Sequence, residues 1–243
     1  MRIFGRSLRK FDALRRVLES TPGRHKEPSL IVSADDELTR PSERLFDLSF
    51  SAINRARAVD FPDLASRTSS EPRWYNVWPG EHYKLLAALV GALGARQVIE
   101  IGTSTGMGTL ALAQFLPPGG HITTFDIVPW REFKQTWLRD SDFASDRIAQ
   151  EIADIAKPGG IAPFTSLFQG ADFIFIDGPK DGVTEQKFID ALVSLRLPKK
   201  PLIMFDDIRV LNMIEIWRRL DHPKMDLTSF GHWSGTGLVD WNA

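Results

Sequence analysis

Three apolar segments of this chain each end on an aspartate, and the third ends on a pair. The residues are Asp126, Asp177, and Asp206 with Asp207. Lys180 follows three positions after the second of these acids. Carboxylate oxygens accept hydrogen bonds from hydroxyl groups and bind hard divalent cations, and a lysine beside them supplies a positive charge or, with a lowered pKa, a base. These residue types therefore indicate a site for a hydroxyl-bearing ligand, for a metal ion, or for both.

A glycine-rich stretch at residues 98–108 could complete such a site. Its first four residues, V-I-E-I, are typical of a buried strand, because β-branched apolar residues suit a strand that is covered on both faces. Gly102 and Gly106 allow a tight turn and a close approach of the backbone to a ligand. Thr105 can cap the helix that follows. Glu100 is a carboxylate inside the apolar strand, so it requires a partner or marks a site.

The elements that must position these residues alternate between strand and helix patterns from residue 96 onward, which predicts an α/β fold with a mostly parallel sheet. The predicted strands are residues 97–101, 121–127, 148–152, 171–177, 202–205, 225–230 and 236–241. Residues 148–152 would also suit a helix. The last two strands flank a glycine-containing turn and are expected to form an antiparallel β-hairpin. The predicted helices cover residues 1–20, 41–53, 81–93, 106–115, 131–137, 164–168, 183–195 and 210–220. Residues 21–40 and 59–73 are expected to be loops.

The carboxyl ends of parallel strands lie along one edge of a sheet, and ligands bind in the crevice at that edge. The four aspartates and the glycine turn are therefore expected to meet there. Any one of these acids taken alone is more often the cap of a following helix. Four acids on three strand ends beside a glycine turn favour a shared site.

The bulk composition excludes several classes of function. Hydrophobic residues make up 43% of the 243 residues, charged residues 25%, and the formal net charge is -1, so there is no overall field suited to nucleic acid or to an anionic membrane. The chain has 0 cysteines, which excludes disulfides, cysteine-bound zinc and thiol catalysis. The longest apolar run, residues 85–95, is far shorter than the ~20 residues of a membrane span. We expect a cytoplasmic protein.

Two classes of cofactor suit a glycine turn followed by a strand-end acid. A dinucleotide fingerprint has the spacing G-x-G-x-x-G, whereas here Gly102 is followed by Gly106 and Gly108. An acid about twenty residues after the turn suits a ribose diol in either class, and Asp126 is in that position. The glycine spacing speaks against an NAD(P)-dependent oxidoreductase, which we keep as an alternative. The acids at Glu100 and Asp126 favour a ligand with free hydroxyl and amino groups.

The sequence E-I-G-T-S-T-G-M-G, residues 100–108, resembles motif I of the class I S-adenosylmethionine-dependent methyltransferases. The resemblance covers the chain from about residue 78 onward and includes the order of elements and the closing hairpin. The motif D-G-P-K at residues 177–180, followed by F-D-D at 205–207, resembles the catechol and caffeoyl-CoA type of O-methyltransferase. The resemblance implies a Rossmann-like, seven-stranded, mostly parallel sheet with helices on both faces.

The resemblance also implies roles for individual residues. S-adenosylmethionine would be bound by the following residues: Val77, Glu81, Glu100, Gly102, Thr103, Gly106, Gly108, Asp126, Asp154 and Ile155. Among these, Asp126 would hold the ribose hydroxyls, and Asp154 and Ile155 would flank the adenine. A divalent cation, Mg²⁺, would be held by Asp177, Asp206 and Asp207. Lys180 would be the catalytic base, assisted by Asp177. The second acid of the pair is often asparagine in that family, so Asp207 keeps an oxygen ligand and adds a charge.

The chemistry of methyl transfer agrees with these residue types. Transfer from a sulfonium is an in-line displacement, so the protein must align acceptor oxygen, methyl group and sulfur. Three carboxylates repel one another unless a cation lies among them, and that cation is either Mg²⁺ or Lys180 itself. The sequence therefore predicts a methyltransferase that acts on a small-molecule hydroxyl with the help of a divalent cation. The alternatives are a metal-independent methyltransferase of the same fold, the oxidoreductase, and a non-catalytic partner subunit.

The remaining expectations concern organisation. Residues 1–75 are predicted to form a helical N-terminal extension and residues 76–243 the cofactor-binding domain. The amphipathic pattern of residues 1–20 suits packing on the domain or on a second subunit, so a homodimer is expected. The histidines show no spacing typical of metal ligands. His232 is predicted to lie on the surface of the hairpin, and the alternative is that it faces the acceptor.

Overall fold

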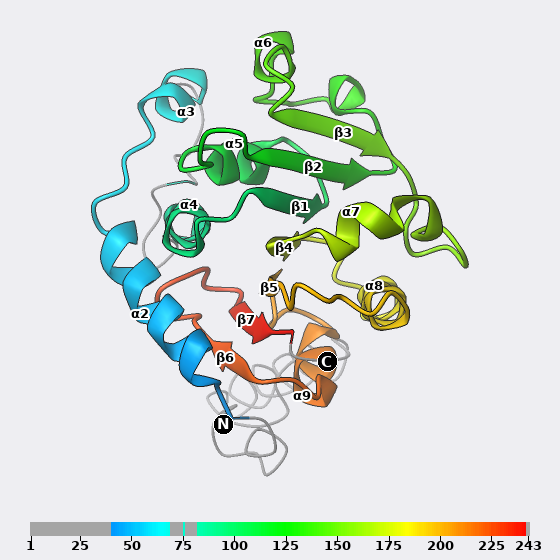
Figure 1. Ribbon diagram of the computed structural model, residues 1–243. Helices are drawn as coiled ribbons and strands as arrows, with labels where there is room; N and C mark the ends of the chain where they lie inside the picture. The colour runs from blue at the N-terminus through cyan, green and yellow to red at the C-terminus, as the bar shows by residue number, and fades with distance from the viewer. Residues whose placement is uncertain (1–39, 69–74, 76–81, 242–243) are drawn as a thin grey trace, which may run out of the picture.

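Seven strands form one sheet at the centre of the computed structural model, which describes residues 40–68, 75 and 82–241 (Figure 1). The strands are β1 (Gln97–Ile101), β2 (His121–Asp126), β3 (Ile148–Ile152), β4 (Phe173–Ile176), β5 (Leu202–Asp206), β6 (Lys224–Asp226) and β7 (Thr236–Asp240). Their order across the sheet is β3-β2-β1-β4-β5-β7-β6. The strands β1 to β5 pair in parallel, and β7 pairs antiparallel with both β5 and β6. The predicted fold class is confirmed, including the closing hairpin.

Apolar side chains on both faces explain why the central strands are parallel. All residues of β4 and β5 are buried, and so are four of the five residues of β1. A strand buried on both faces must be covered by helices on each side, and the connecting helices of a parallel sheet supply that cover. The strand order changes direction between β1 and β4, so the crevice expected to bind a ligand opens at the carboxyl ends of these two strands.

Helices lie on both faces of the sheet. Their bounds are α2 (Glu43–Ala56), α3 (Pro62–Arg67), α4 (His82–Leu93), α5 (Met107–Ala113), α6 (Asp140–Phe143), α7 (Thr165–Gln169), α8 (Thr184–Ser194) and α9 (Met213–Arg219), with short 3₁₀ helices η3 (Trp130–Glu132) and η4 (Ala162–Phe164). The helices α2, α4 and α5 cover one face, and α7, α8 and α9 cover the other (Figure 1). The sheet therefore separates two apolar cores, as a doubly wound fold requires.

Helix α4 is the central helix of the first core. It is rich in leucine and alanine, which are strong helix formers, and its residues from Leu85 to Val90 are all buried. Helix α2 packs across it with the buried side chains of Leu45 and Ala52. Ser42 caps α2 by accepting a hydrogen bond from the backbone N–H of Leu45. The N-terminal part that the structure describes is therefore built into the first core.

Three local predictions were wrong. Thr105 was expected to cap the helix after the glycine turn, but Gly106 is the N-cap of α5 and no side chain among the described residues caps this helix. Residues 59–73 were expected to be a loop, yet α3 forms there, because Pro62 takes the first helical position and Leu64 is buried. Residues 131–137 were expected to be helical, but only the 3₁₀ turn η3 forms. The backbone N–H of Trp137 bonds instead to the carbonyl of Thr105, at 2.8 Å, so this segment is held against the glycine turn.

Some predicted features lie outside the described residues. They are the amphipathic helix at 1–20, most of the loop at 21–40, and the two predicted cofactor contacts Val77 and Glu81. Among the helices of the described ranges, none combines the length and the apolar character that a membrane crossing requires.

Candidate active site

The turn after β1 joins the ends of three strands. Gly102 donates its backbone N–H to the carbonyl of Phe125 on β2, at 2.8 Å. A Cβ atom on Gly102 would lie 2.1 Å from the carbonyl oxygen of Asp177, just after β4, and the φ of Gly102 is +105°. Only glycine can take this conformation at this distance. The close approach brings the ends of β1, β2 and β4 to one place.

Glu100 lies beneath this turn and is 1% exposed. Its carboxylate accepts a hydrogen bond from the hydroxyl of Thr109 on α5. Gly108 makes room for it, because a Cβ there would lie 2.4 Å from Glu100 Oε1. Burial raises the pKa of Glu100 to about 8, even though the Thr109 hydroxyl acts in the opposite direction. Glu100 is thus a buried acid that joins the strand to the following helix.

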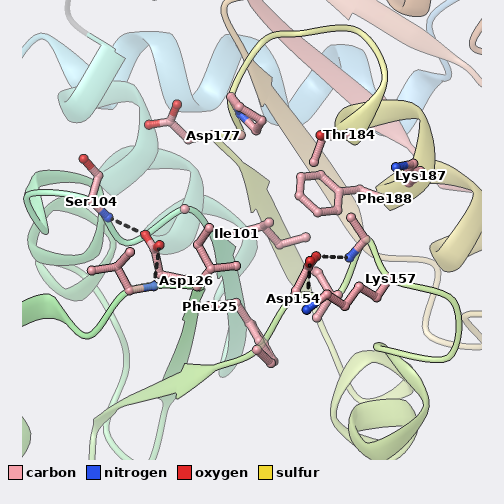
Figure 2. A pocket seen from close by; sticks show the side chains of 18 of the residues that line it. Ile101, Ser104, Phe125, Asp126, Asp154, Lys157, Asp177, Thr184, Lys187 and Phe188 are labelled. Atoms are coloured by element: carbon pink, nitrogen blue, oxygen red, sulfur yellow. Dashed lines mark hydrogen bonds and ion pairs between the residues drawn. The ribbon is translucent and has the colours of Figure 1, made fainter.

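Asp126 points into the crevice from the end of β2 (Figure 2). One carboxylate oxygen accepts the N–H of Ser104 at 3.0 Å, and the other accepts the N–H of Val128 at 3.1 Å. Asp154 is held similarly after β3, where it accepts the N–H of Ala156 at 3.1 Å. Because backbone groups fix both carboxylates, their remaining lone pairs face the crevice in a set orientation.

A cavity of about 730 Å³ lies between these strand ends. This volume is within the range of ligand pockets. Six predicted site residues line it: Gly102, Asp126, Asp154, Ile155, Asp177 and Lys180. Six other predicted residues are not part of its lining: Glu100, Thr103, Gly106, Gly108, Asp206 and Asp207. Thr103 is buried and exchanges a hydrogen bond with Thr124 at 2.7 Å, so it braces β1 against β2.

The second half of the site is a cluster of charged residues after β4 and β5. Lys180 pairs with Asp177 and, at 3.1 Å from its Nζ, with Asp207 Oδ2. Burial alone would lower the pKa of Lys180, but the two aspartates outweigh it and raise the pKa above its ordinary value. Lys180 therefore carries a positive charge in this arrangement. To act as the predicted base, Lys180 must first lose a proton. That requires a weaker interaction with the two carboxylates, which raise its pKa.

The two acids after β5 differ in their environments. Asp206 is buried, and desolvation raises its pKa well above the ordinary value. Burial would also raise the pKa of Asp207, but hydrogen bonds from His232 and Ser234 and the charge of Lys180 lower it below the ordinary value. Adjacent carboxylates with opposite shifts are typical of a functional site.

Two histidines border this acid pair, and neither was predicted from the sequence. The Nδ1 atom of His232 lies 3.3 Å from Asp207 Oδ1 and 3.7 Å from Asp206 Oδ1. Its side chain is 31% exposed, so His232 lies at the surface of the hairpin as predicted and also contacts the acid pair. His82, the first residue of α4, lies with its Nδ1 3.6 Å from Asp206 Oδ1, and burial lowers its pKa to about 3. The pairing of β7 with β5 places the loop before β7, which carries His232, beside the end of β5.

The residues around the acid pair have the donor set of a cation site. Asp206, Asp207 and His232 each offer a ligand atom, and these atoms lie within 4.8 Å of one another. Within the part of the chain that the structure describes, Asp206 Oδ1 is buried without a hydrogen-bond partner. A buried carboxylate oxygen without a partner is costly, and a cation would satisfy it.

Comparison with known proteins identifies the family of this chain. A family model described as O-methyltransferase matches residues 61–211. A probable caffeoyl-CoA O-methyltransferase of Dictyostelium discoideum is 26% identical over 155 residues, which are 59% of this chain and 56% of that protein. The catechol O-methyltransferase of Mycobacterium tuberculosis is 30% identical over 99 residues, 40% of this chain and 43% of that protein. The matched segment thus spans about half the length of these curated relatives.

The fold also has a counterpart among solved structures. The crystal structure of cofactor-bound Rv0187 from MTB aligns with a TM-score of 0.54 and 24% identity, over 84% of this chain and 99% of that one. At this identity the likeness concerns the fold. The family model, by contrast, extends from just before α3 to just before α9, which is more than half of the chain, and it includes both motifs quoted above. The chain belongs to the O-methyltransferase family, as the motifs at residues 100–108 and 177–180 predicted.

Proposed function

We propose that this chain is an S-adenosylmethionine-dependent methyltransferase that methylates a hydroxyl group of a small molecule. The observation that carries the proposal is the composition of one cavity, which is lined by Asp126, Asp177 and Lys180. Asp126 suits the ribose of a nucleoside cofactor, and Asp177 with Lys180 suits a hydroxyl that must lose its proton. The two relatives named above are O-methyltransferases, which supports the same reaction.

In the proposed complex, the chain's own residues supply orientation and charge. Asp126 accepts the ribose hydroxyls, while Asp154 and Ile155 border the adenine. Gly102 allows the methionine part of the cofactor to approach the backbone, and Glu100, Thr103, Gly106 and Gly108 maintain the turn beneath it. The predicted contacts of Val77 and Glu81 stay part of the proposal. The alignment of acceptor and methyl group is the main contribution of the protein to such a displacement.

The metal part of the proposal concerns Asp177, Asp206 and Asp207 with a divalent cation such as Mg²⁺. A cation bound there would lower the pKa of the acceptor hydroxyl. Lys180 contacts two of the three acids, so cation binding and the proton affinity of Lys180 are linked. Chelation with EDTA should abolish methyl transfer and leave cofactor binding intact. Full activity in EDTA would favour the metal-independent alternative.

Calorimetric titration with S-adenosylmethionine, S-adenosylhomocysteine and NADH tests the cofactor. We expect both sulfur nucleotides to bind and NADH not to bind. Asp126→Asn should weaken binding about 10- to 100-fold, because it removes hydrogen bonds to a charged acceptor worth about 1.5–3 kcal/mol. Asp140→Asn changes an exposed aspartate of α6 outside the cavity and is the matched control. Binding of NADH alone would overturn the proposal in favour of the oxidoreductase.

Transfer of a labelled methyl group tests the reaction. Catechol, the substrate in the name of the Mycobacterium tuberculosis relative, is the first acceptor to try. Cofactor binding without transfer to any hydroxyl acceptor in a broad panel would favour the non-catalytic alternative.

The proposal also covers the domain organisation and the oligomeric state. Residues 1–75 would form an extension to a cofactor domain at 76–243, and the protein would be a homodimer. Phe46 and Phe50 on α2 support an interface, because each is 48% exposed and their ring centroids are 4.8 Å apart. Sedimentation velocity should give a dimer for the full chain and a monomer for Phe46→Ser combined with Phe50→Ser. The cytoplasmic location stays a prediction from the sequence.

A further inference from the structure

We infer that His232 is a nitrogen ligand of the divalent cation, together with Asp206 and Asp207, and that this donor set selects a late first-row transition ion over Mg²⁺. The inference rests on the metal-assisted form of the proposed function. It differs from the all-carboxylate site that the sequence predicted, because an imidazole from the hairpin joins the carboxylates of the acid pair.

The geometry places the imidazole beside both acids. His232 Nδ1 lies 3.3 Å from Asp207 Oδ1 and 3.7 Å from Asp206 Oδ1. All three ligand atoms lie within 4.8 Å of one another. A metal ion with ligand distances near 2.0–2.2 Å brings its donors to such separations. The atom Nδ1 also lies 2.5 Å from the hydroxyl of Ser234, which donates to Asp207 Oδ1.

Two buried atoms without partners provide independent support. Among the residues that the structure describes, neither Asp206 Oδ1 nor His82 Nδ1 has a hydrogen-bond partner, although both side chains are at least nine-tenths buried. These atoms are 3.6 Å apart, and Asp206 Oδ1 also faces His232. Buried polar groups are normally satisfied, so an orphaned carboxylate oxygen beside an imidazole indicates a missing ligand.

The arrangement of charges shows which carboxylate oxygens are nearest to the imidazole. Lys180 pairs with Asp177 and with the Oδ2 atom of Asp207. The oxygens near His232 are Asp207 Oδ1 and Asp206 Oδ1, and neither is paired with the ammonium group. One lysine cannot balance three carboxylates, whereas a lysine and a divalent cation together can.

The hairpin holds His232 in place before any ion binds. Its backbone N–H bonds to Thr236 Oγ1 at 2.8 Å, and Thr236 is paired with Asp206 across β5 and β7. Gly231 accommodates that threonine, because a Cβ there would lie 2.3 Å from Thr236 Oγ1. Gly235 has φ +115° and lies so close to Ile208 and Arg209 that no side chain fits. The loop is therefore built to present its histidine to the acid pair.

The identity of the donors determines the preferred ion. Mg²⁺ binds oxygen ligands and keeps much of its water, so an imidazole adds little to its affinity. Imidazole nitrogen favours later first-row ions in the order Fe²⁺, Co²⁺, Ni²⁺. A site with two carboxylates and one imidazole should bind Co²⁺ more tightly than Mg²⁺.

The test uses the full-length protein, freed of metal with a chelator and titrated with Co²⁺ or Mg²⁺ by calorimetry. His232→Ala should weaken Co²⁺ binding at least about tenfold, the lower end of the loss caused even by removing a supporting partner of a ligand. Binding of Mg²⁺ should change much less. The Kd for Mg²⁺ divided by the Kd for Co²⁺ should therefore fall in the variant. His121→Ala is the matched control, because His121 is the first residue of β2 and lies at the amino end of the parallel strands, whereas the acid pair lies at their carboxyl ends. It should leave both Kd values unchanged.

Proton NMR of the Co²⁺-loaded wild type gives a direct reading. Coordinated imidazole should produce hyperfine-shifted ring resonances, and these should disappear in His232→Ala but persist in His121→Ala. Equal Co²⁺ affinity of the His232→Ala variant and the wild type, or the absence of shifted histidine resonances, would refute the inference. Binding of S-adenosylhomocysteine, measured on the same samples, reports separately on the proposed function and on folding.

Discussion

Glu100 is an acid whose environment favours its neutral form. It is 1% exposed, and burial raises its pKa to about 8 from an ordinary value near 4.5. The folded protein therefore holds a proton on Glu100 between these two values, whereas the unfolded chain releases it. The stability linked to this proton is fully present below pH 4.5 and is lost as the pH rises toward 8.

Glu100→Gln tests this linkage, because the amide has the same shape and no charge. The free energy of unfolding of the cofactor-free wild type should fall relative to that of the variant by up to about 1.4 kcal/mol per pH unit between pH 5 and 8. Urea denaturation at several pH values measures the difference, in which all other titrating groups cancel. A difference that does not change with pH would show that Glu100 is ionised in the folded state.

Lys180 combines two properties that conflict in a base. It is largely buried, which favours the neutral amine, but it contacts Asp177 and Asp207, which favour the ammonium. The second effect is larger in this structure. The proposed reaction depends on the side-chain nitrogen of Lys180 in both roles, as a proton acceptor and as a positive charge among the acids.

We expect Lys180→Met to lower kcat about 100-fold or more, the usual cost of losing a positioned proton acceptor or donor. Cofactor affinity should change little, because Asp126 and the glycine turn remain. Lys199→Met removes a lysine that pairs with Asp172 at the opposite end of β4, and it should keep normal turnover. Methyl transfer under saturating cofactor measures both variants. Unchanged kcat in Lys180→Met would remove Lys180 from the proposed mechanism.

At the scale of elements, the turn between β1 and α5 decides the shape of the site. Its close approach to β4 depends on the absence of a side chain at Gly102. The carbonyl of Thr105 within the same turn accepts a hydrogen bond from the backbone N–H of Trp137. A displacement of the turn would therefore also displace the loop after β2. The turn is a packing requirement as well as part of the proposed cofactor site.

Gly102→Ala should therefore destabilise the protein by about 3 kcal/mol or more, through backbone strain and displacement of β4. Gly119→Ala is the matched control, since Gly119 also has positive φ, +73°, but has no atom within 4 Å of an added Cβ. Its cost should be about 1 kcal/mol, the strain alone. Chemical denaturation measures both. Equal losses of unfolding free energy in the two variants would show that the backbone at Asp177 can move away from an added Cβ at little cost.

At the scale of the molecule, hydrogen bonds join the N-terminal end of α2, the first described helix, to β7, the last strand. The buried carboxylate of Asp240 on β7 accepts hydrogen bonds from Ser42 at 2.5 Å and from Arg44 at 2.6 Å. Helix α2 also packs on α4, which begins with His82 beside the acid pair. The hairpin that carries His232 and the helix that carries His82 are thus supported by the same contacts.

Arg44→Ala should cost about 1–3 kcal/mol, because the buried Asp240 loses a charged hydrogen-bond donor. Arg219→Ala breaks an exposed pair with Glu215 on α9 and should cost less than about 0.5 kcal/mol. Thermal or urea unfolding distinguishes the two variants. Equal stabilities would mean that Ser42 and solvent satisfy Asp240 without the arginine.

The sequence predicted much of this molecule because its signals are local. The apolar runs before Asp177 and Asp206 marked the central strands, and the glycines at 102, 106 and 108 marked the turn. The short helix α3 and the turn at η3 were missed, because their conformations depend on what they contact. The family relationship followed from the same local motifs.

Asp126, Asp154, Asp177 and Lys180 meet in one cavity because parallel strands deliver their carboxyl ends to one edge, and that consequence can be read from element order alone. His82 and His232 could not be placed in this way. Each reaches Asp206 only through the packing of α4 on the sheet and the antiparallel pairing of β7 with β5, and no spacing along the chain encodes either contact. The sequence by itself thus determined the fold, the cofactor crevice and the acids. The tertiary structure decided which groups surround those acids, because long-range pairing brings together residues that are far apart in sequence.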